Sequence, residues 1–152
     1  MENVNFNRYS LRQFRGLFAS LDVPEIGTLA GKYRGAFVGP AWVRALARPA
    51  LLITGLGGWW GKVIYEDGRA VNIVSSDQKI STRFRMKLRQ ERSYIDGREG
   101  IALHYQKDNP FLWLFIADEI RRLDDSTLLG MTRPKIPGLR WLAFPFVLRK
   151  VD

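Results

Sequence analysis

Residues 82–96, TRFRMKLRQERSYID, alternate apolar and basic side chains through their first half. Phe84, Met86 and Leu88 occupy every second position. The positions between and beside them are cationic: Arg83, Arg85, Lys87 and Arg89. A repeat of two is the period of a β-strand, which sends successive side chains to opposite faces of a sheet. The segment therefore predicts a strand with one face toward a core and a basic face toward water.

Other short segments have the same strand-like character and are separated by tight turns. Asp67-Gly68 and Asp96-Gly97 are hairpin dipeptides, because both residue types tolerate positive φ, and Asn109-Pro110 predicts a further turn. Residues 111–125 have the length of a helix, but their aromatic and β-branched start favours a long strand. The predicted strands cover residues 31–39, 59–67, 69–75, 82–96, 99–107, 111–125, 126–134 and 140–151.

Two segments predict helices. Ser10 is a suitable N-cap for a helix that ends near Asp22, and its apolar side chains recur at helical spacing: Leu11, Phe14, Leu17, Phe18 and Leu21. We expect this N-terminal segment, residues 1–22, to cap an apolar edge or mouth. Residues 40–55 open with a proline that suits the first helical turn and predict a short helix interrupted near Pro49.

This order of elements predicts a mainly β fold in a single domain of 152 residues. A helix, a strand, a helical crossover and about seven further strands favour a closed antiparallel barrel of about eight strands. Closure removes exposed strand edges. A barrel of that size has an interior just wide enough for side chains or for one small ligand.

Composition excludes several classes of site. The chain has no cysteine, so it forms no disulfide or cysteine-ligated metal site, and its single histidine cannot build a histidine-rich one. We predict neither a metal nor a cofactor. No signal-peptide pattern or membrane-length apolar run is present, so the expected localisation is cytoplasmic. The sequence does not indicate whether the protein is a monomer or an oligomer.

The formal net charge of +9 is compatible with an anionic partner. Nucleic-acid binding would use the cationic face formed by Arg83, Arg85, Lys87 and Arg89, and the helix at residues 10–22 is a candidate for contact with a membrane surface. Both are less favoured than a solvated basic surface, because the cations are scattered and the densest cluster follows the alternation of a strand.

The order of motifs resembles the GXWXG-type lipocalin-like proteins, small bacterial domains of the calycin group. GKYRG at residues 31–35 stands where that family has Gly-x-Trp-x-Gly, with Tyr33 in place of tryptophan. WWGK at residues 59–62, the Asn109-Pro110 turn, ADEIRRLDD, LLG and FPFVLRK follow in the family's order. The resemblance implies a barrel whose end Tyr33 plugs, and the wider group implies binding of small apolar ligands. The family's own function is largely undefined.

The barrel gives the aromatic and polar side chains two interpretations, a filled core or a ligand cavity. Trp59 and Trp141 are two of the aromatic residues that could line such a cavity or fill such a core. Lys62 is a cation that could hold a ligand's carboxylate, and Asp118 or Glu119 could form an internal ion pair with Arg34 or Lys62. The ligand-binding candidates are Tyr33, Trp60, Lys62, Phe84, Met86, Tyr105, Trp113, Phe115, Arg121 and Phe144.

His104 is the candidate for acid–base chemistry. If Ile101, Leu103 and Tyr105 face inward, His104 lies at the surface, and this register is favoured. In the other register His104 would enter the cavity, where it could act with Glu119 or Asp118 near neutral pH.

Three functions follow from these alternatives. The favoured one is binding, without catalysis, of a small hydrophobic ligand inside the barrel, including an anionic one such as a fatty acid. The second is a cofactor-independent isomerase or cyclase that uses His104 and Glu119 in the cavity. The third is a basic nucleic-acid or anionic-surface binder.

Overall fold

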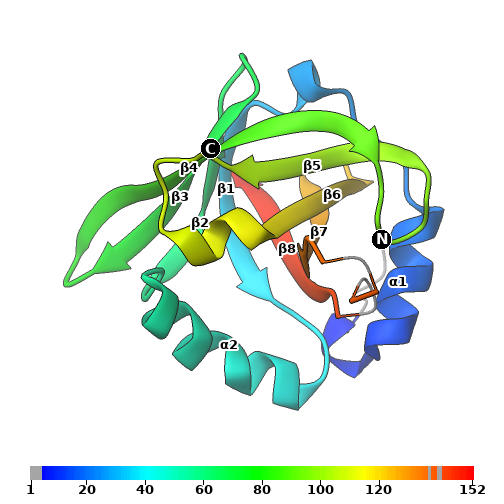
Figure 1. The fold of residues 1–152 in the computed structure, drawn as a ribbon, viewed down its shortest axis with the longest axis horizontal. Helices are drawn as coiled ribbons and strands as arrows, with labels where there is room; N and C mark the ends of the chain where they lie inside the picture. The colour runs from blue at the N-terminus through cyan, green and yellow to red at the C-terminus, as the bar shows by residue number, and fades with distance from the viewer. Residues whose placement is uncertain (1–4, 137, 140–141) are drawn as a thin grey trace.

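The computed structural model describes residues 5–136, 138–139 and 142–152. Eight antiparallel strands pair in chain order, and the last closes on the first to form a barrel (Figure 1). This confirms the closed eight-strand barrel predicted from the strand and turn pattern. The strands are β1 (Gly31–Phe37), β2 (Trp59–Ile64), β3 (Arg69–Ser76), β4 (Lys79–Arg92), β5 (Glu99–Tyr105), β6 (Ile116–Asp124), β7 (Thr127–Pro134) and β8 (Phe144–Val151).

The N-terminal helix α1 (Leu11–Ser20) packs on the outside of the barrel wall. It begins with a capping box, in which the Gln13 amide donates to Ser10 Oγ at 3.1 Å and the Ser10 amide donates to Gln13 Oε1 at 2.8 Å. Phe14 and Phe18 are fully buried against the outward-facing apolar side chains of β7 and β8. The segment thus covers an apolar face of the barrel wall (Figure 1). The mouth of the barrel is instead lined by a second helix.

That second helix, α2 (Ala41–Thr54), joins β1 to β2 and runs without a break. The predicted interruption at Pro49 is wrong: proline removes a single backbone donor, and the helix continues through it. It ends at Gly55, whose left-handed φ of 94° lets the Leu56 amide return to the Leu51 carbonyl at 2.8 Å.

Residues 111–115 also differ from the prediction of one long strand. They form a short 3₁₀-helix, η3 (Phe111–Phe115), and the strand β6 starts only at Ile116. Pro110 fixes φ at −53° immediately before the turn, and the Trp113 indole N–H donates to the Thr54 carbonyl at 2.8 Å. This contact attaches η3 to the end of α2.

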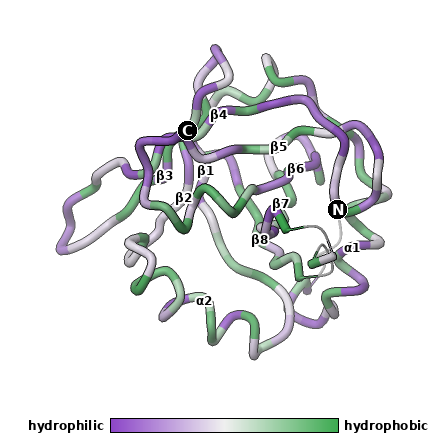
Figure 2. Tube along the Cα trace, in the orientation of Figure 1, coloured by the Kyte–Doolittle hydropathy of each residue, from purple (hydrophilic) through white to green (hydrophobic). Residues whose placement is uncertain are grey.

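The hairpin dipeptides form turns as expected, with Gly68 at φ 84° and Gly97 at φ 76°. A third tight turn, between β3 and β4, has positive φ at both Asp77 and Gln78. Its tip is hydrophilic (Figure 2).

Alternation along the strands separates the barrel interior from the outer face. On β4 Met86 and Leu88 are buried inside, whereas Arg85 and Lys87 are exposed outside. Arg83 departs from this alternation, because a register shift pairs it with the inward-facing Asn72, and its guanidinium donates to the Gly55 carbonyl at 3.2 Å. On β5 Ile101, Leu103 and Tyr105 face the interior. His104 therefore faces outward, in the register that the sequence favoured.

Tyr33 lies in the apolar core of the barrel. Its hydroxyl donates to the Leu29 carbonyl at 2.8 Å, so this buried polar atom is satisfied. Burial raises the pKa of Tyr33, against the opposing charge of Arg122. In the described part of the chain, no helix has the length and apolar character needed to cross a membrane.

Candidate functional site: an apolar cavity beneath helix α2

A cavity of about 570 Å³ lies between α2 and the barrel interior. Its volume falls within the range of small-molecule binding sites. One wall is the inner side of α2, the others are strands and η3, and its lining is mostly apolar. The lining residues are Phe37, Val43, Leu46, Ala47, Pro49, Ala50, Leu51, Ile53, Thr54, Leu56, Trp59, Lys62, Asn72, Tyr105, Trp113, Ile116, Asp118, Thr132, Phe144 and Phe146.

A cluster of buried and partly buried polar side chains, one from each of five strands, gives this apolar cavity a polar floor. The Lys62 ammonium lies 2.9 Å from Asp118 Oδ2 and donates to Asn72 Oδ1 at 2.7 Å. Asn72 Nδ2 donates to the Tyr105 hydroxyl at 3.3 Å, and Thr132 Oγ1 donates to Asp118 Oδ1 at 2.8 Å. We call these five residues the polar floor; they are the inward-facing polar groups that a mostly apolar ligand would meet.

The Lys62–Asp118 pair is the internal ion pair that the sequence allowed, with Lys62 as the partner rather than Arg34. Arg34 faces outward because it alternates with the buried Tyr33 on β1. Both members of the pair are almost completely buried, so each depends on the other to offset its desolvation.

Tyr105 contributes a hydroxyl that remains protonated. Burial, together with the nearby charge of Asp118, raises its pKa well above the ordinary value of 10.0, against the hydrogen bond from Asn72. No described residue accepts a hydrogen bond from this hydroxyl, which therefore has a proton to donate toward the cavity.

Aromatic rings surround the ammonium of Lys62. It lies 5.8 Å from the ring centres of Trp59 and Phe146 and 5.9 Å from that of Tyr105. The Trp59 indole N–H donates to Asn72 Oδ1 at 3.2 Å, which ties the aromatic wall to the polar floor. These rings position the cation and limit its access to water.

The mouth of the cavity has exposed apolar side chains. On α2, Leu46 and Ile53 line the cavity while remaining 60% and 83% exposed. On η3, which is attached to α2 through Trp113, Phe111 and Leu112 are also exposed. A ligand that enters the cavity beside α2 would therefore pass apolar side chains.

The structure brings several predicted ligand-binding residues to this cavity. Lys62, Tyr105, Trp113 and Phe144 line it. Phe84 packs against Trp113, with ring centres 5.4 Å apart. Tyr33 and Met86 lie in the barrel core: the Met86 sulfur is 3.6 Å from the Lys62 ammonium.

Three other candidates lie away from the cavity, so the expectation that they share it is wrong. Trp60 is on the outer face of the barrel, beneath Lys32 and Arg34. A β-bulge between Trp59 and Gly61 shifts the alternation, so that Trp59 and Lys62 face inward although Trp60 does not.

Phe115 is the second of these three candidates. It stacks edge-on against Phe111 at the surface, because η3 turns its side chain away from the interior. Arg121 lies under α1, with its guanidinium over the Phe18 ring. It is on the outward-facing side of β6, one position from the inward-facing Ile120. Trp141, the remaining aromatic of the set, lies outside the described residues.

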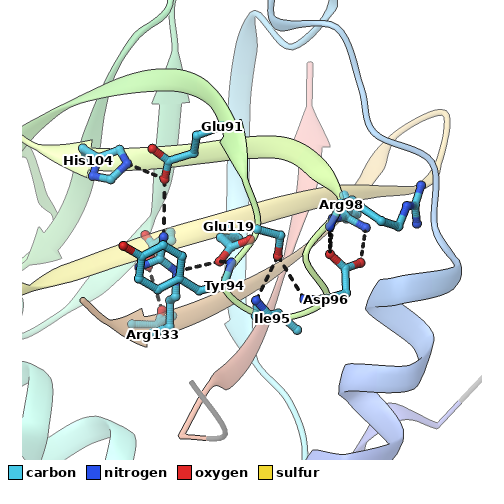
Figure 3. A network of polar contacts seen from close by, with 12 residues as sticks. Glu91, Tyr94, Ile95, Asp96, Arg98, His104, Glu119 and Arg133 are labelled. Atoms are coloured by element: carbon cyan, nitrogen blue, oxygen red, sulfur yellow. Dashed lines mark hydrogen bonds and ion pairs between the residues drawn. The ribbon is translucent and has the colours of Figure 1, made fainter. Parts of the chain in front are cut away.

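His104 and Glu119 are outside the barrel as well, so the pair required inside the cavity for catalysis does not form there. His104 Nε2 lies 2.8 Å from Glu91 Oε1, and Glu119 Oε2 accepts from Arg133 Nε at 2.6 Å (Figure 3). Arg133 also stacks on the Tyr94 ring at 3.8 Å. The cluster joins β4, β5, β6 and β7 on the outer wall.

The environment of His104 favours its neutral form. Burial lowers its pKa below the ordinary value of 6.5, and Lys135 and Arg89 act in the same direction. The hydrogen bond and charge of Glu91 oppose this shift without overcoming it. The His104 side chain is 13% exposed, so it is mostly buried in this polar cluster although it faces outward from the barrel.

Three features of the site were missed in the sequence: Asn72, Thr132 and the inner side of α2. Asn72 is fully buried at the centre of the polar floor, and its only signal was a lone amide within the apolar run AVNIV. The inner side of α2 forms a wall of the cavity, which the helical pattern alone did not indicate. Among the described residues, no three His, Asp or Glu side chains group closely enough to hold a metal ion.

A crystal structure of a protein from Thermomonospora curvata has a similar fold. The two structures match with a TM-score of 0.72 at 20% identity, over 95% of this chain and 90% of that one. At this identity the likeness concerns the fold alone, and it fits a lipocalin-like barrel. No protein-family model matches the chain, and no curated protein sequence matches it. Membership of the GXWXG family therefore stays a prediction.

Proposed function

We propose that the protein binds a small hydrophobic ligand inside the barrel, beneath α2. The observation that carries this proposal is the cavity of about 570 Å³, lined almost throughout by apolar side chains and closed below by the polar floor. A filled core would leave no such space, because protein interiors are packed to the density of organic crystals.

The arrangement of the cavity indicates how such a ligand would lie. An apolar chain or ring system would occupy the space between α2 and the aromatic wall of Trp59, Trp113 and Phe146. A single polar end would reach Lys62 and Tyr105 at the floor. A fatty-acid-like molecule, with one polar end and one long apolar part, has this general form.

Filling the cavity tests the proposal. Ala47 is on the inner side of α2 and lines the cavity, so Ala47→Trp would occupy the ligand's space. Ala45 is on the same helix, is exposed and does not line the cavity, so Ala45→Trp is the matched control. Binding is measured by titrating a fluorescent fatty-acid analogue and, independently, by native mass spectrometry of protein isolated from cells.

We expect the wild type and Ala45→Trp to bind the analogue and Ala47→Trp to lose at least about tenfold in affinity. Native mass spectra should show bound small molecules on the first two proteins and fewer on the third. Equal affinity in all three proteins would place the analogue elsewhere and contradict the proposal.

A further inference from the structure

Lys62 and Asp118 are the charged residues among the described side chains that line the cavity, and they form one ion pair. Their opposite charges cancel at a separation of 2.9 Å. The polar floor therefore has no net charge, although it contains an ammonium group.

The hydrogen-bonding capacity of the pair is also largely used. The Lys62 ammonium is directed to Asp118 and Asn72, and the Met86 sulfur is a third, weaker acceptor at 3.6 Å. Asp118 accepts a second hydrogen bond, from Thr132. The Tyr105 hydroxyl, by contrast, accepts from Asn72 and has no described acceptor for its proton. The floor's spare group is therefore a neutral donor.

We propose that the cavity selects ligands whose polar end is a neutral hydrogen-bond acceptor, such as a ketone or ester carbonyl, over ligands that end in a carboxylate. This inference rests on the proposed function. A carbonyl oxygen accepts from Tyr105 without needing a counter-charge. A carboxylate would lose its hydration in the buried cavity, and the neutral Lys62–Asp118 pair offers it no net counter-charge in return.

A ligand carboxyl can avoid this desolvation cost by binding in its protonated form. Burial raises the pKa of a carboxyl group, and a charge-neutral ion pair does not offset that rise. The affinity for a fatty acid should therefore fall as pH rises above its solution pKa, by about tenfold for each unit of pH. The affinity for a neutral ketone should change little over the same range.

Dodecanoate and methyl undecyl ketone are suitable probes, because they share the apolar chain and differ by an oxygen anion in place of a methyl group. Isothermal titration calorimetry of the wild-type protein with each probe, from mildly acidic to mildly alkaline solution, measures the preference. In alkaline solution we expect the ketone to bind at least about tenfold more tightly than dodecanoate. The difference in affinity between the two probes should narrow as pH falls.

Asp118→Asn tests the role of the ion pair directly. The substitution keeps the shape of the side chain and an oxygen for Thr132, but it leaves Lys62 without a counter-charge. We expect the preference to reverse, with dodecanoate binding more tightly than the ketone. The double variant Lys62→Met with Asp118→Asn removes both charges, and we expect it to retain the preference for the ketone.

The outcomes separate this inference from the proposed function. If the wild type binds dodecanoate as tightly as the ketone in alkaline solution, the inference is overturned while the proposed function stands. An unchanged preference in folded Asp118→Asn overturns it as well. If Asp118→Asn does not fold, the inference is tested by the wild-type pH series and by the double variant instead. If neither probe binds the wild type, both the inference and the proposed function are contradicted.

Discussion

Gly35, in the GKYRG segment of β1, illustrates how a single missing side chain shapes the cavity wall. In the structure a Cβ atom at Gly35 would lie 2.3 Å from the Trp59 ring, far inside van der Waals contact. The glycine therefore provides the space in which the Trp59 indole packs and reaches Asn72.

We predict that Gly35→Ala lowers the free energy of unfolding by about 1–3 kcal/mol, the usual cost of overpacking a core. Gly16 is the control, because it is exposed on α1 and a Cβ there meets no atom within 4 Å. Gly16→Ala should raise the free energy of unfolding by about 0.5–1 kcal/mol through helix propensity. Chemical denaturation measures both; equal effects of the two substitutions would contradict the packing role of Gly35.

At the scale of elements, the loop between β4 and β5 is attached to β6 and α1 by one buried ion pair. Arg121 Nη1 and Nη2 donate to the two oxygens of Asp96 at 2.9 and 3.1 Å, and Arg121 Nη1 also donates to the Phe18 carbonyl at 3.1 Å. Burial alone would raise the pKa of Asp96. The hydrogen bonds and charge of Arg121, with the Arg98 amide, outweigh burial and lower it below 3.8.

This lowered pKa makes a prediction for stability in acid. Because the folded protein holds the Asp96 proton less tightly than the unfolded chain does, the contribution is complete above about pH 4 and is lost as pH falls toward the folded-state pKa. Asp96→Asn should destabilise the protein by about 3–5 kcal/mol near neutral pH, because it leaves Arg121 buried without its partner. Denaturation at several pH values should show this difference shrinking in acid; a constant difference would contradict the assignment.

The elements also show why some of the site was predictable. The eight strands were predictable because each carries a local signal, either the alternation of residues 82–96 or a turn dipeptide such as Asp67-Gly68. The same alternation placed Asp118 and Glu119 on opposite faces of β6, but it left open which of the two points inward; the structure assigns that position to Asp118. Trp60 was misplaced because one β-bulge reverses the alternation within β2. A bulge is set by pairing between strands, which the residues of one strand do not reveal.

At the scale of the whole molecule, the hollow interior could not be predicted. Whether a barrel is filled or empty depends on how its ends are closed by distant segments. Here α2 and η3 cover one mouth, and they are joined by the hydrogen bond from Trp113 to Thr54. The same aromatic composition would serve equally well in a filled core, so the cavity becomes visible only once these elements are placed together.

If this cavity receives an apolar ligand, as proposed, the tryptophans that line it will report the binding directly. Trp59 and Trp113 line the cavity, whereas Trp60 lies on the outer face beneath Lys32 and Arg34. Nitrogen–proton NMR spectra resolve the indole N–H groups during a titration with methyl undecyl ketone. We predict saturable shifts for Trp59 and Trp113 and little change for Trp60. An absence of shifts for the two cavity tryptophans, or an equal shift for Trp60, would contradict ligand binding in this cavity.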